Sequence, residues 1–236
     1  EVSNGSFSQE GVELVTNGDF SNGENNWNFG SSSWILVNGV AESISTASGF
    51  LSQFNVFDLS VKEYKLTYEI ITTNNGALRL AGGNSAFGTV TIPSTVGVHT
   101  VYLQSNGTTR NLQFWNATTF IGSIDNISVK EVGQDWTLGT GWSIGDDKAV
   151  ATNSASGQKL RQAGQLAASK TYKLVYEVTE ITLGGFSPIV GAVAGTAVYS
   201  IGTYTEYITT INDDFYIRTL GTTSGSITNI SVKEVG

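Results

Sequence analysis

Apolar and polar residues alternate along many short segments of this chain. Within residues 64–70 the apolar positions are Tyr64, Leu66, Tyr68 and Ile70, and the positions between them are polar. A period of two puts one set of side chains on each face of a β-strand, so this segment predicts a strand with one buried face. Similar segments recur about every 8 to 12 residues between turn residues, which predicts a β-sandwich. We expect strands at 34–37, 40–44, 49–54, 64–72, 77–81, 88–92, 99–104, 111–116 and 124–130, and later at 148–152, 159–161, 172–179, 188–193, 198–201, 206–210, 215–220 and 227–233.

One of these segments occurs twice. Residues 122–133 return as residues 225–236 with eleven of twelve positions identical, and the single difference is Asp125 against Thr228. The strand expected at 64–70 also has a second copy further along the chain. A repeat of roughly 100 residues is too long for a solenoid unit and has the size of a small domain. The repeat therefore predicts two homologous domains in tandem.

The fold that we expect is all-β, with two tandem jelly-roll β-sandwich domains. Residues 13–133 form the first domain and residues 134–236 the second, and residues 1–12 are expected to be a linker or the end of a preceding unit. The first domain opens with the sequence Asn-Gly-Asp-Phe at 17–20. We expect no counterpart of this opening loop in the second domain.

The charge balance is acidic, with 12 Lys and Arg against 20 Asp and Glu. Binding of nucleic acid or of anionic membranes relies on basic residues, so neither partner is expected. The absence of Cys excludes disulfides and thiolate metal sites. The uncharged run 181–205 contains five Gly and a Pro, which indicates strands and turns and no membrane insertion. Because the chain lacks Met and begins with Glu1, we expect a segment of a longer protein or a processed product.

Residues for catalysis are few. His99 is the only His, so a Ser-His-Asp triad has one possible base, and we expect this residue to be structural. Acidic residues are present, but their positions do not single out the paired carboxylates of a glycosidase. We therefore expect a protein that is not an enzyme.

Aromatic residues divide into core positions and outward positions. Trp27, Trp34, Trp136 and Trp142 recur at equivalent places in both domains, which favours a role in the core. Strand alternation predicts a second set that points away from the core and could form a polar groove with one aromatic platform per domain for sugar rings. This set is Trp115, Gln113, Arg79 and Glu69 in the first domain, and Tyr216 and Arg218 in the second. A solvated sheet face or a contact between domains is the other interpretation of the same positions.

Four features of the first domain together resemble a known family. They are the opening Asn-Gly-Asp-Phe at 17–20, Trp27 after a polar loop, the Tyr-x-Leu-x-Tyr strand at 64–68, and the closing Ile-Asp-Asn-Ile-Ser-Val at 124–129. They are similar to carbohydrate-binding jelly-roll modules, the galactose-binding-like modules attached to secreted polysaccharidases. The ending Asn-Ile-Ser-Val-Lys-Glu-Val is similar to tandem modules in tail, fibre and other virion proteins of bacteriophages. The resemblance implies a binding module and not an enzyme.

The resemblance also implies a structural calcium ion between the opening loop and the last strand. The matching carboxylates here are Asp19 and Asp125, and calcium takes six to eight oxygen ligands. The expected loss of the opening loop in the second domain, together with Thr228 in place of Asp125, fits loss of the whole site. The alternative is that Asp19 serves a turn and that Asp125 is an edge residue.

The function expected from the sequence is adhesion to glycans from an extracellular or virion surface. The partners would be glycans or other virion or extracellular subunits, in a larger assembly with many copies. A purely structural fibre or decoration subunit is the alternative, and a glycan-processing enzyme is a weaker one. An exposed Trp115 would favour adhesion, whereas a Trp115 buried against another subunit would favour the structural role.

Overall fold

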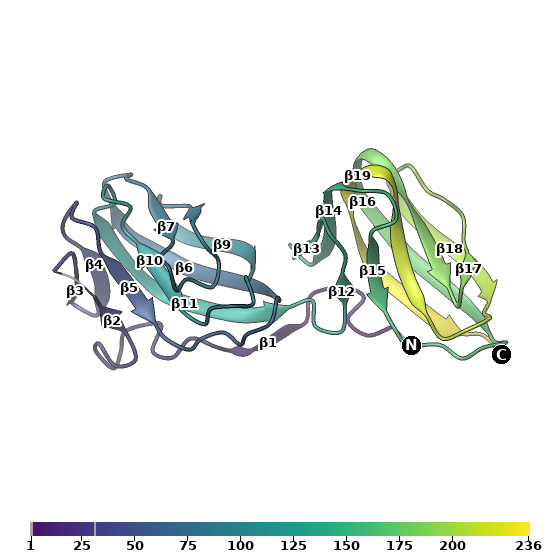
Figure 1. The fold of residues 1–236 in the computed structure, drawn as a ribbon, viewed down its shortest axis with the longest axis horizontal. Coiled ribbons are helices and arrows are strands. Elements are labelled where there is room, and N and C mark those ends of the chain that lie inside the picture. Colours follow the sequence, from purple (N-terminus) through teal and green to yellow (C-terminus); the bar gives the residue numbers. More distant parts are fainter. Residues whose placement is uncertain (1, 31) are drawn as a thin grey trace. The chain divides into compact units, whose positions relative to one another are not determined.

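The computed structural model describes residues 2–30 and 32–236. The chain divides into two compact units (Figure 1). Gly11–Glu131 is here called the inserted unit, because Glu1–Glu10 and Val132–Gly236 together form the other, here called the split unit. In the described ranges the regular structure consists of strands, which confirms the all-β prediction. The same ranges contain no helix that is long and apolar enough to cross a bilayer.

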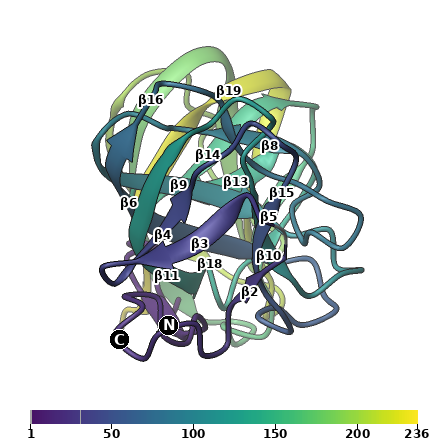
Figure 2. The same cartoon turned by 90° about the vertical axis from the view of Figure 1, so that its left-hand side faces the viewer.

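The inserted unit is a sandwich of two sheets (Figures 1 and 2). One sheet has the strand order β3-β4-β11-β6-β9, with β1 also paired to β11, and the other has the order β2-β5-β10-β7-β8. Placing β4, β11, β6 and β9 in one layer and β5, β10, β7 and β8 in the other is the connectivity of a jelly roll. The strands are β1 Glu10–Glu13, β2 Asn28–Phe29, β3 Trp34–Val37, β4 Val40–Ser43, β5 Phe50–Gln53, β6 Glu63–Thr73, β7 Leu78–Leu80, β8 Val90–Ile92, β9 Gly97–Gln104, β10 Leu112–Trp115 and β11 Gly122–Val132.

The core of the inserted unit follows the predicted alternation. Leu66, Tyr68 and Ile70 on β6 are fully buried and Tyr64 is 1% exposed, so this strand presents one apolar face to the interior. Burial of such faces is the main source of stability in a sandwich. The four tryptophans expected in the core are all buried: Trp27, Trp34, Trp136 and Trp142.

The strands of the split unit form one eight-stranded sheet, in which two strands are much longer than the others. These strands are β16 (Thr171–Val190) and β19 (Phe215–Glu234), which pair with each other in antiparallel register. The register shifts four times along the pair, and such bulges let a strand bend from one layer into the next. The expected strand 172–179 and the first residues of the expected strand 188–193 therefore belong to one continuous strand, which ends at Val190. The remaining strands are β12 Thr137–Leu138, β13 Trp142–Gly145, β14 Lys148–Ser154, β15 Lys159–Gln162, β17 Val193–Ala194 and β18 Gly202–Thr209.

In the inserted unit, the opening loop packs on a tryptophan and on the last strand. Trp27 Nε1 donates a hydrogen bond to the Asn17 carbonyl at 2.8 Å, and the Ile127 N–H donates to the Gly18 carbonyl at 2.9 Å. The Phe20 ring lies 5.3 Å from the Trp27 ring. Asn17 and Phe20 have φ angles of 56° and 51°. This combination of contacts and angles defines the loop.

The first residues of the chain make the same contacts in the split unit. Trp136 Nε1 donates to the Asn4 carbonyl at 3.1 Å, and the Ile230 N–H donates to the Gly5 carbonyl at 2.9 Å. The Phe7 ring lies 5.1 Å from the Trp136 ring and is 1% exposed. The φ angles of Asn4 and Phe7 are 46° and 56°. The opening loop therefore occurs in both units.

The prediction that residues 1–12 are a linker or the end of a preceding unit is wrong. So is the prediction that the second domain lacks the opening loop. Gln162 holds the backbone of Ser3 through two hydrogen bonds of 3.0 and 2.6 Å, as Gln53 holds Thr16 through bonds of 2.9 and 2.8 Å. The chain thus begins the split unit, builds the inserted unit, and then completes the split unit.

Candidate functional site

Three outward side chains form a row across the five-stranded sheet of the inserted unit. Trp115 on β10 lies opposite Phe50 on β5 and Arg79 on β7. A neighbour of each along its own strand is fully buried, so the three side chains face away from the core. Phe50, Trp115 and Arg79 are called the aromatic row below.

Several contacts hold the indole of Trp115 in place. Its ring stacks on Phe50, with the ring centroids 6.2 Å apart and the planes at 23°. The Arg79 guanidinium carbon lies 5.6 Å from the Trp115 ring centroid, within the range of a cation–π interaction. Trp115 Nε1 donates to Ser48 Oγ at 3.0 Å. A ring oriented in advance loses less conformational entropy when a ligand stacks on it.

Two polar atoms beside the aromatic row are left without a hydrogen bond. Gln113 Nε2 donates to Ser52 Oγ at 3.3 Å, but Gln113 Oε1 and Arg79 Nε are buried and bond to none of the described residues. Buried polar atoms are nearly always satisfied, so an open acceptor and an open donor point to water or to a ligand. The structure thus brings together Trp115, Gln113 and Arg79, as expected from strand alternation.

Glu69 does not join this group, which corrects the expectation of one groove. It lies on β6 in the other sheet, and its Oε2 accepts a hydrogen bond from Asn126 Nδ2 at 2.8 Å. The outward faces of the two sheets point in opposite directions in a sandwich. Alternation identifies Glu69 correctly as outward, but it does not say which sheet carries it.

Tyr216 and Arg218 face outward from β19 in the split unit, because their neighbours along the strand are buried. Lys159 Nζ lies 4.2 Å from the centroid of the Tyr216 ring, so a cation already covers this aromatic side chain. Arg218 pairs with Lys159, the first residue of β15. In the same way, Trp115 pairs with Phe50, the first residue of β5. Arg218 and not Tyr216 therefore takes the place of Trp115, and the expected pair of equivalent aromatic platforms is absent from these described positions.

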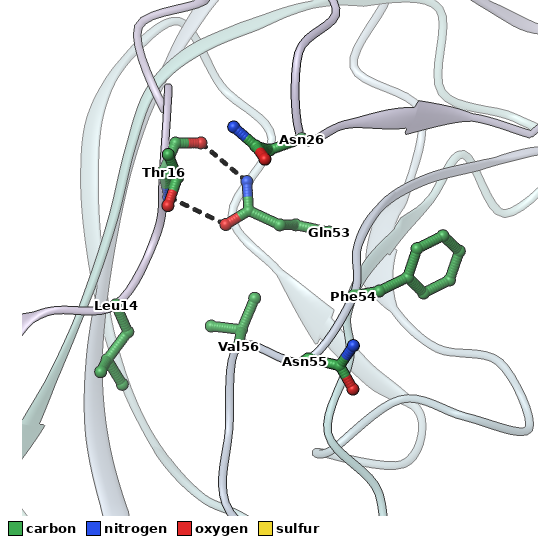
Figure 3. Close-up of a pocket in the computed structure, with 7 residues that line it drawn as sticks. All are labelled: Leu14, Thr16, Asn26, Gln53, Phe54, Asn55 and Val56. Atoms are coloured by element: carbon green, nitrogen blue, oxygen red, sulfur yellow. Dashed lines mark hydrogen bonds between the residues drawn. The ribbon is translucent and has the colours of Figure 1, made fainter.

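A pocket of about 310 Å³ opens beside the end of β5 in the inserted unit (Figure 3). Its lining consists of Leu14, Thr16, Asn26, Gln53, Phe54, Asn55 and Val56. Both polar ends of the Gln53 amide are occupied by the backbone of Thr16, whereas Phe54 is 51% exposed. The lining contains no titratable side chain, so the pocket suits binding better than proton transfer. Strand alternation does not predict this pocket, because its lining comes from segments that are separate in the sequence.

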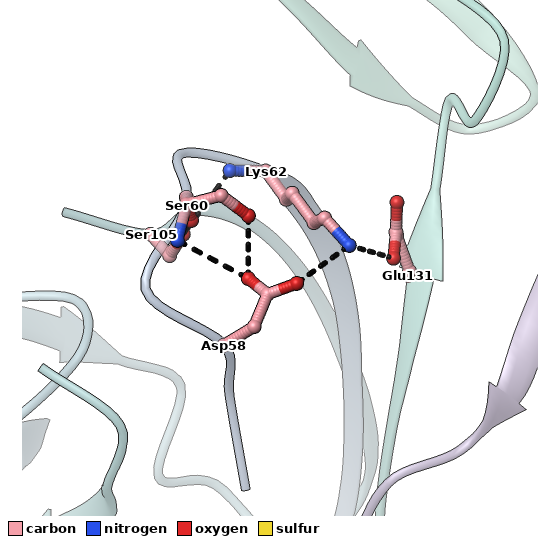
Figure 4. Close-up of polar contacts among 5 residues, drawn as sticks. All are labelled: Asp58, Ser60, Lys62, Ser105 and Glu131. Atoms are coloured by element: carbon pink, nitrogen blue, oxygen red, sulfur yellow. Dashed lines mark hydrogen bonds and ion pairs between the residues drawn. The ribbon is translucent and has the colours of Figure 1, made fainter. Parts of the chain in front are cut away.

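A charged network joins the loop after β5 to β11 (Figure 4). Lys62 Nζ lies 2.8 Å from an oxygen of Asp58 and 2.9 Å from an oxygen of Glu131. Ser60 Oγ donates to Asp58, and Ser105 Oγ donates to the Ser60 carbonyl at 2.9 Å. The hydrogen bonds to Asp58 and Glu131 raise the pKa of Lys62, and Lys62 lowers the pKa of Asp58. A lysine held protonated in this way cannot serve as a base, so the network stabilises the packing of the loop against β11.

His99 is accounted for by packing. Its Nε2 lies 2.6 Å from the Thr95 carbonyl oxygen, and its ring lies 5.4 Å from the Tyr68 ring. These contacts match the structural role expected from the sequence.

The two carboxylates expected at a calcium site differ in their surroundings. Asp19 Oδ1 accepts hydrogen bonds from Ser21 N and Oγ at 3.2 and 2.9 Å, and these bonds lower the pKa of Asp19. Asp125 Oδ1 is buried and bonds to none of the residues in the described ranges. Burial raises the pKa of Asp125, and the charges of Asp19 and Glu69 raise it further. An open, buried carboxylate oxygen fits a cation, although no group of three or more His, Cys, Asp or Glu occurs in those ranges.

The split unit shows which groups face this position. Thr228, the counterpart of Asp125, donates from Oγ1 to the Asp147 carbonyl at 2.8 Å and lies 3.4 Å from the Ser6 carbonyl oxygen. A hydroxyl can donate to carbonyl oxygens, whereas an ionised carboxylate cannot. The opening loop is present in both units, and its Asp is replaced by Ser6 in the split unit. Both carboxylates are therefore lost together, although the loop is kept.

No family model and no curated protein matches the chain. Among solved structures, the chain is similar to a Paenibacillus xanthan lyase, with 11% identity over 89% of this chain and 25% of that chain, and a TM-score of 0.30. The chain therefore spans about a quarter of the length of that lyase. At this TM-score the likeness does not bear on the ligand of this chain.

Proposed function

We propose that this chain is a non-catalytic carbohydrate-binding protein that holds glycans on the aromatic row of the inserted unit. The observation that carries the proposal is the pair of Gln113 Oε1 and Arg79 Nε, which have no hydrogen-bond partner in the described ranges and lie beside the indole of Trp115. A sugar ring supplies an apolar face of C–H groups and hydroxyls that both donate and accept. Stacking on a fixed ring with a few convergent polar groups is the usual composition of such a site.

The proposal includes no chemical step. Hydrolysis of a glycosidic bond uses two carboxyl groups about 5 to 10 Å apart, and the aromatic row and Gln113 supply none. The setting that we propose is an extracellular assembly or a bacteriophage virion, as a tail, fibre or decoration protein. The resemblance of the ending Asn-Ile-Ser-Val-Lys-Glu-Val at 126–132 supports this setting, and many copies would turn weak single sites into firm adhesion.

The test is binding of the wild-type chain to a glycan array, followed by titration of the bound glycan. Trp115→Ala is expected to weaken binding by about 1 to 3 kcal/mol, or roughly 5- to 150-fold, because it removes the stacking surface. Gln113→Leu keeps the volume but removes the open acceptor, and it is expected to weaken binding about tenfold.

Tyr207→Ala is the matched control, since Tyr207 is an aromatic residue of the split unit that is 64% exposed. It is expected to bind like the wild type. A Trp115→Ala variant that folds and binds glycan with unchanged affinity would contradict the proposal. So would a wild type that binds no glycan on the array.

We also propose that Asp125 and Asp19 hold a structural calcium ion in the inserted unit. The open Oδ1 of Asp125 supports this, as does the register shared with the split unit. By that register Gly39 corresponds to Asp147, and by the loop contacts Asp19 corresponds to Ser6, the two residues whose carbonyl groups face Thr228. Calcium accepts carboxylate and carbonyl oxygens alike, so these groups match its preferences.

Calcium is expected to raise the melting temperature of the wild type, with about 2.7 kcal/mol of stabilisation at 100 times the dissociation constant. In the absence of calcium, Asp125→Thr is expected to be at least as stable as the wild type at neutral pH. Because burial raises the pKa of Asp125, its contribution favours the folded state at acid pH and is lost as pH rises through the folded pKa.

The calcium response should disappear in Asp125→Thr, which copies the residue found in the split unit. Thermal unfolding with calcium and with a chelator measures both variants. Equal melting temperatures of the wild type in the two conditions would count against the ion.

A structural role is the second candidate function, and exposed apolar residues favour it. Tyr199, Ile201 and Tyr207 are 63%, 66% and 64% exposed. Tyr207 lies on β18, which pairs with β16 alone among the described strands and so forms a sheet edge. Exposed apolar side chains at an edge suit packing against a neighbouring subunit. Failure of the glycan experiment would favour this role.

A further inference from the structure

In the split unit, cations occupy the places of the aromatic row. β15 pairs with β19 in the register by which β5 pairs with β10. Lys159 therefore takes the place of Phe50, and Arg218 takes the place of Trp115. The next outward-facing pair along the same two strands is Arg161 and Tyr216, two residues further on. We call Lys159, Arg161, Tyr216 and Arg218 the cationic patch.

The arrangement of the cationic patch is unfavourable by itself. Lys159 and Arg218 are direct cross-strand partners, and like charges in that relation repel. The whole chain has only 12 Lys and Arg and a net charge of −8, so the cluster does not follow from a generally basic surface. An arrangement that costs stability locally, on a face equivalent to a candidate binding face, indicates a functional reason.

The neighbouring acidic groups neutralise only part of the cationic patch. Asp214 pairs with Arg161 at 2.7 Å, and Asp213 lies close enough to act on Arg161 as well. Lys159 stands over the Tyr216 ring, where its ammonium group remains exposed to an incoming anion. Arg218 Nε is buried and has no hydrogen bond to any residue that the structure describes. The Lys159 ammonium is therefore open to an anionic ligand, and the partly exposed Arg218 beside it keeps one unpaired N–H.

We infer that the cationic patch binds the acidic groups of a charged polysaccharide, with Arg218 and Lys159 pairing to its carboxylate or sulfate oxygens. Guanidinium groups bind such planar or tetrahedral anions through two parallel hydrogen bonds, and the Tyr216 ring holds the Lys159 ammonium in place beside Arg218. The inference extends the proposed glycan binding to a second surface of different specificity. Two similar folds would thus present an aromatic face and a cationic face, each suited to its own ligand.

Affinity electrophoresis through gels that contain polygalacturonate, heparin or neutral dextran tests this inference. The wild type is expected to be retarded by an acidic polymer and not by dextran. The double variant Lys159→Ala/Arg218→Ala is expected to lose about tenfold or more in affinity for that polymer. Raising the salt from about 50 to about 200 mM should weaken binding of the wild type to the polymer more than binding of the double variant. The reason is that salt screens the charges that only the wild type carries.

Arg110→Ala is the matched control, since it removes one exposed positive charge from the inserted unit, and it should be retarded like the wild type. Trp115→Ala should also keep its retardation, which separates this inference from the aromatic row. Retardation by polygalacturonate alone identifies uronates as the ligand, and retardation by heparin alone identifies sulfated chains. Equal retardation of the wild type and a folded double variant overturns the inference, and so does the absence of retardation by both acidic polymers.

Discussion

Replacing Phe7 with alanine is expected to lower the free energy of unfolding of the split unit by about 3 to 5 kcal/mol. Phe7 is 1% exposed and packs on Trp136 at 5.1 Å, so its removal leaves a cavity beside the tryptophan. The effect is large for a residue so near the start of the chain. It follows from the role of the first residues as the opening loop of the split unit.

Urea unfolding followed by tryptophan fluorescence measures this change, because Trp136 reports on the loop that covers it. Phe54→Ala is the matched control, since Phe54 is 51% exposed and its replacement should change the stability by no more than about 0.5 kcal/mol. If Phe7→Ala unfolds at the same urea concentration as the wild type, the first residues are not part of the split unit.

Alanine at Gly18 or at Gly5 is expected to destabilise the respective unit by roughly 3 kcal/mol. A Cβ at Gly18 would lie 1.9 Å from the Ile127 carbonyl oxygen, and a Cβ at Gly5 would lie 1.8 Å from the Ile230 carbonyl oxygen. Both neighbours are backbone atoms of the last strand, so they cannot rotate away. The hydrogen bond that ties each loop to that strand would be lost as well.

Gly83→Ala supplies the control for these variants. The structure places no described atom within 4 Å of a Cβ at Gly83, so stability should stay within about 0.5 kcal/mol of the wild type. Thermal unfolding of the three variants provides the comparison. Equal melting temperatures for Gly18→Ala and Gly83→Ala would show that the loop does not approach the strand as described.

Much of the fold can be predicted from the sequence because strand alternation is local. The residues of 64–70 alternate between two faces whatever the rest of the chain does, and the structure buries the predicted side. The repeated segments likewise predicted related strands. By contrast, the bulges that join two expected strands into β16 depend on pairing with β19, which lies far away in the sequence.

The opening loop of the split unit is also visible in the sequence, although strand alternation does not predict it. Asn-Gly-Ser-Phe-Ser at 4–8 resembles Asn-Gly-Asp-Phe-Ser at 17–21, and the similarity of these neighbouring segments suggests one loop and its copy. The partner strand of the first segment begins at Phe215, at the other end of the chain. Order along the chain therefore suggested a linker, whereas contacts in space make a loop of the split unit.

The candidate site was only partly predictable for a similar reason. Alternation alone determined that Trp115, Gln113, Arg79 and Glu69 point outward, because the direction of a side chain depends on its own strand. Only the tertiary structure decided that the first three share a sheet and that Glu69 does not. Hydrogen bonding between strands distant in the sequence sets which strands are neighbours, and no local period encodes that choice.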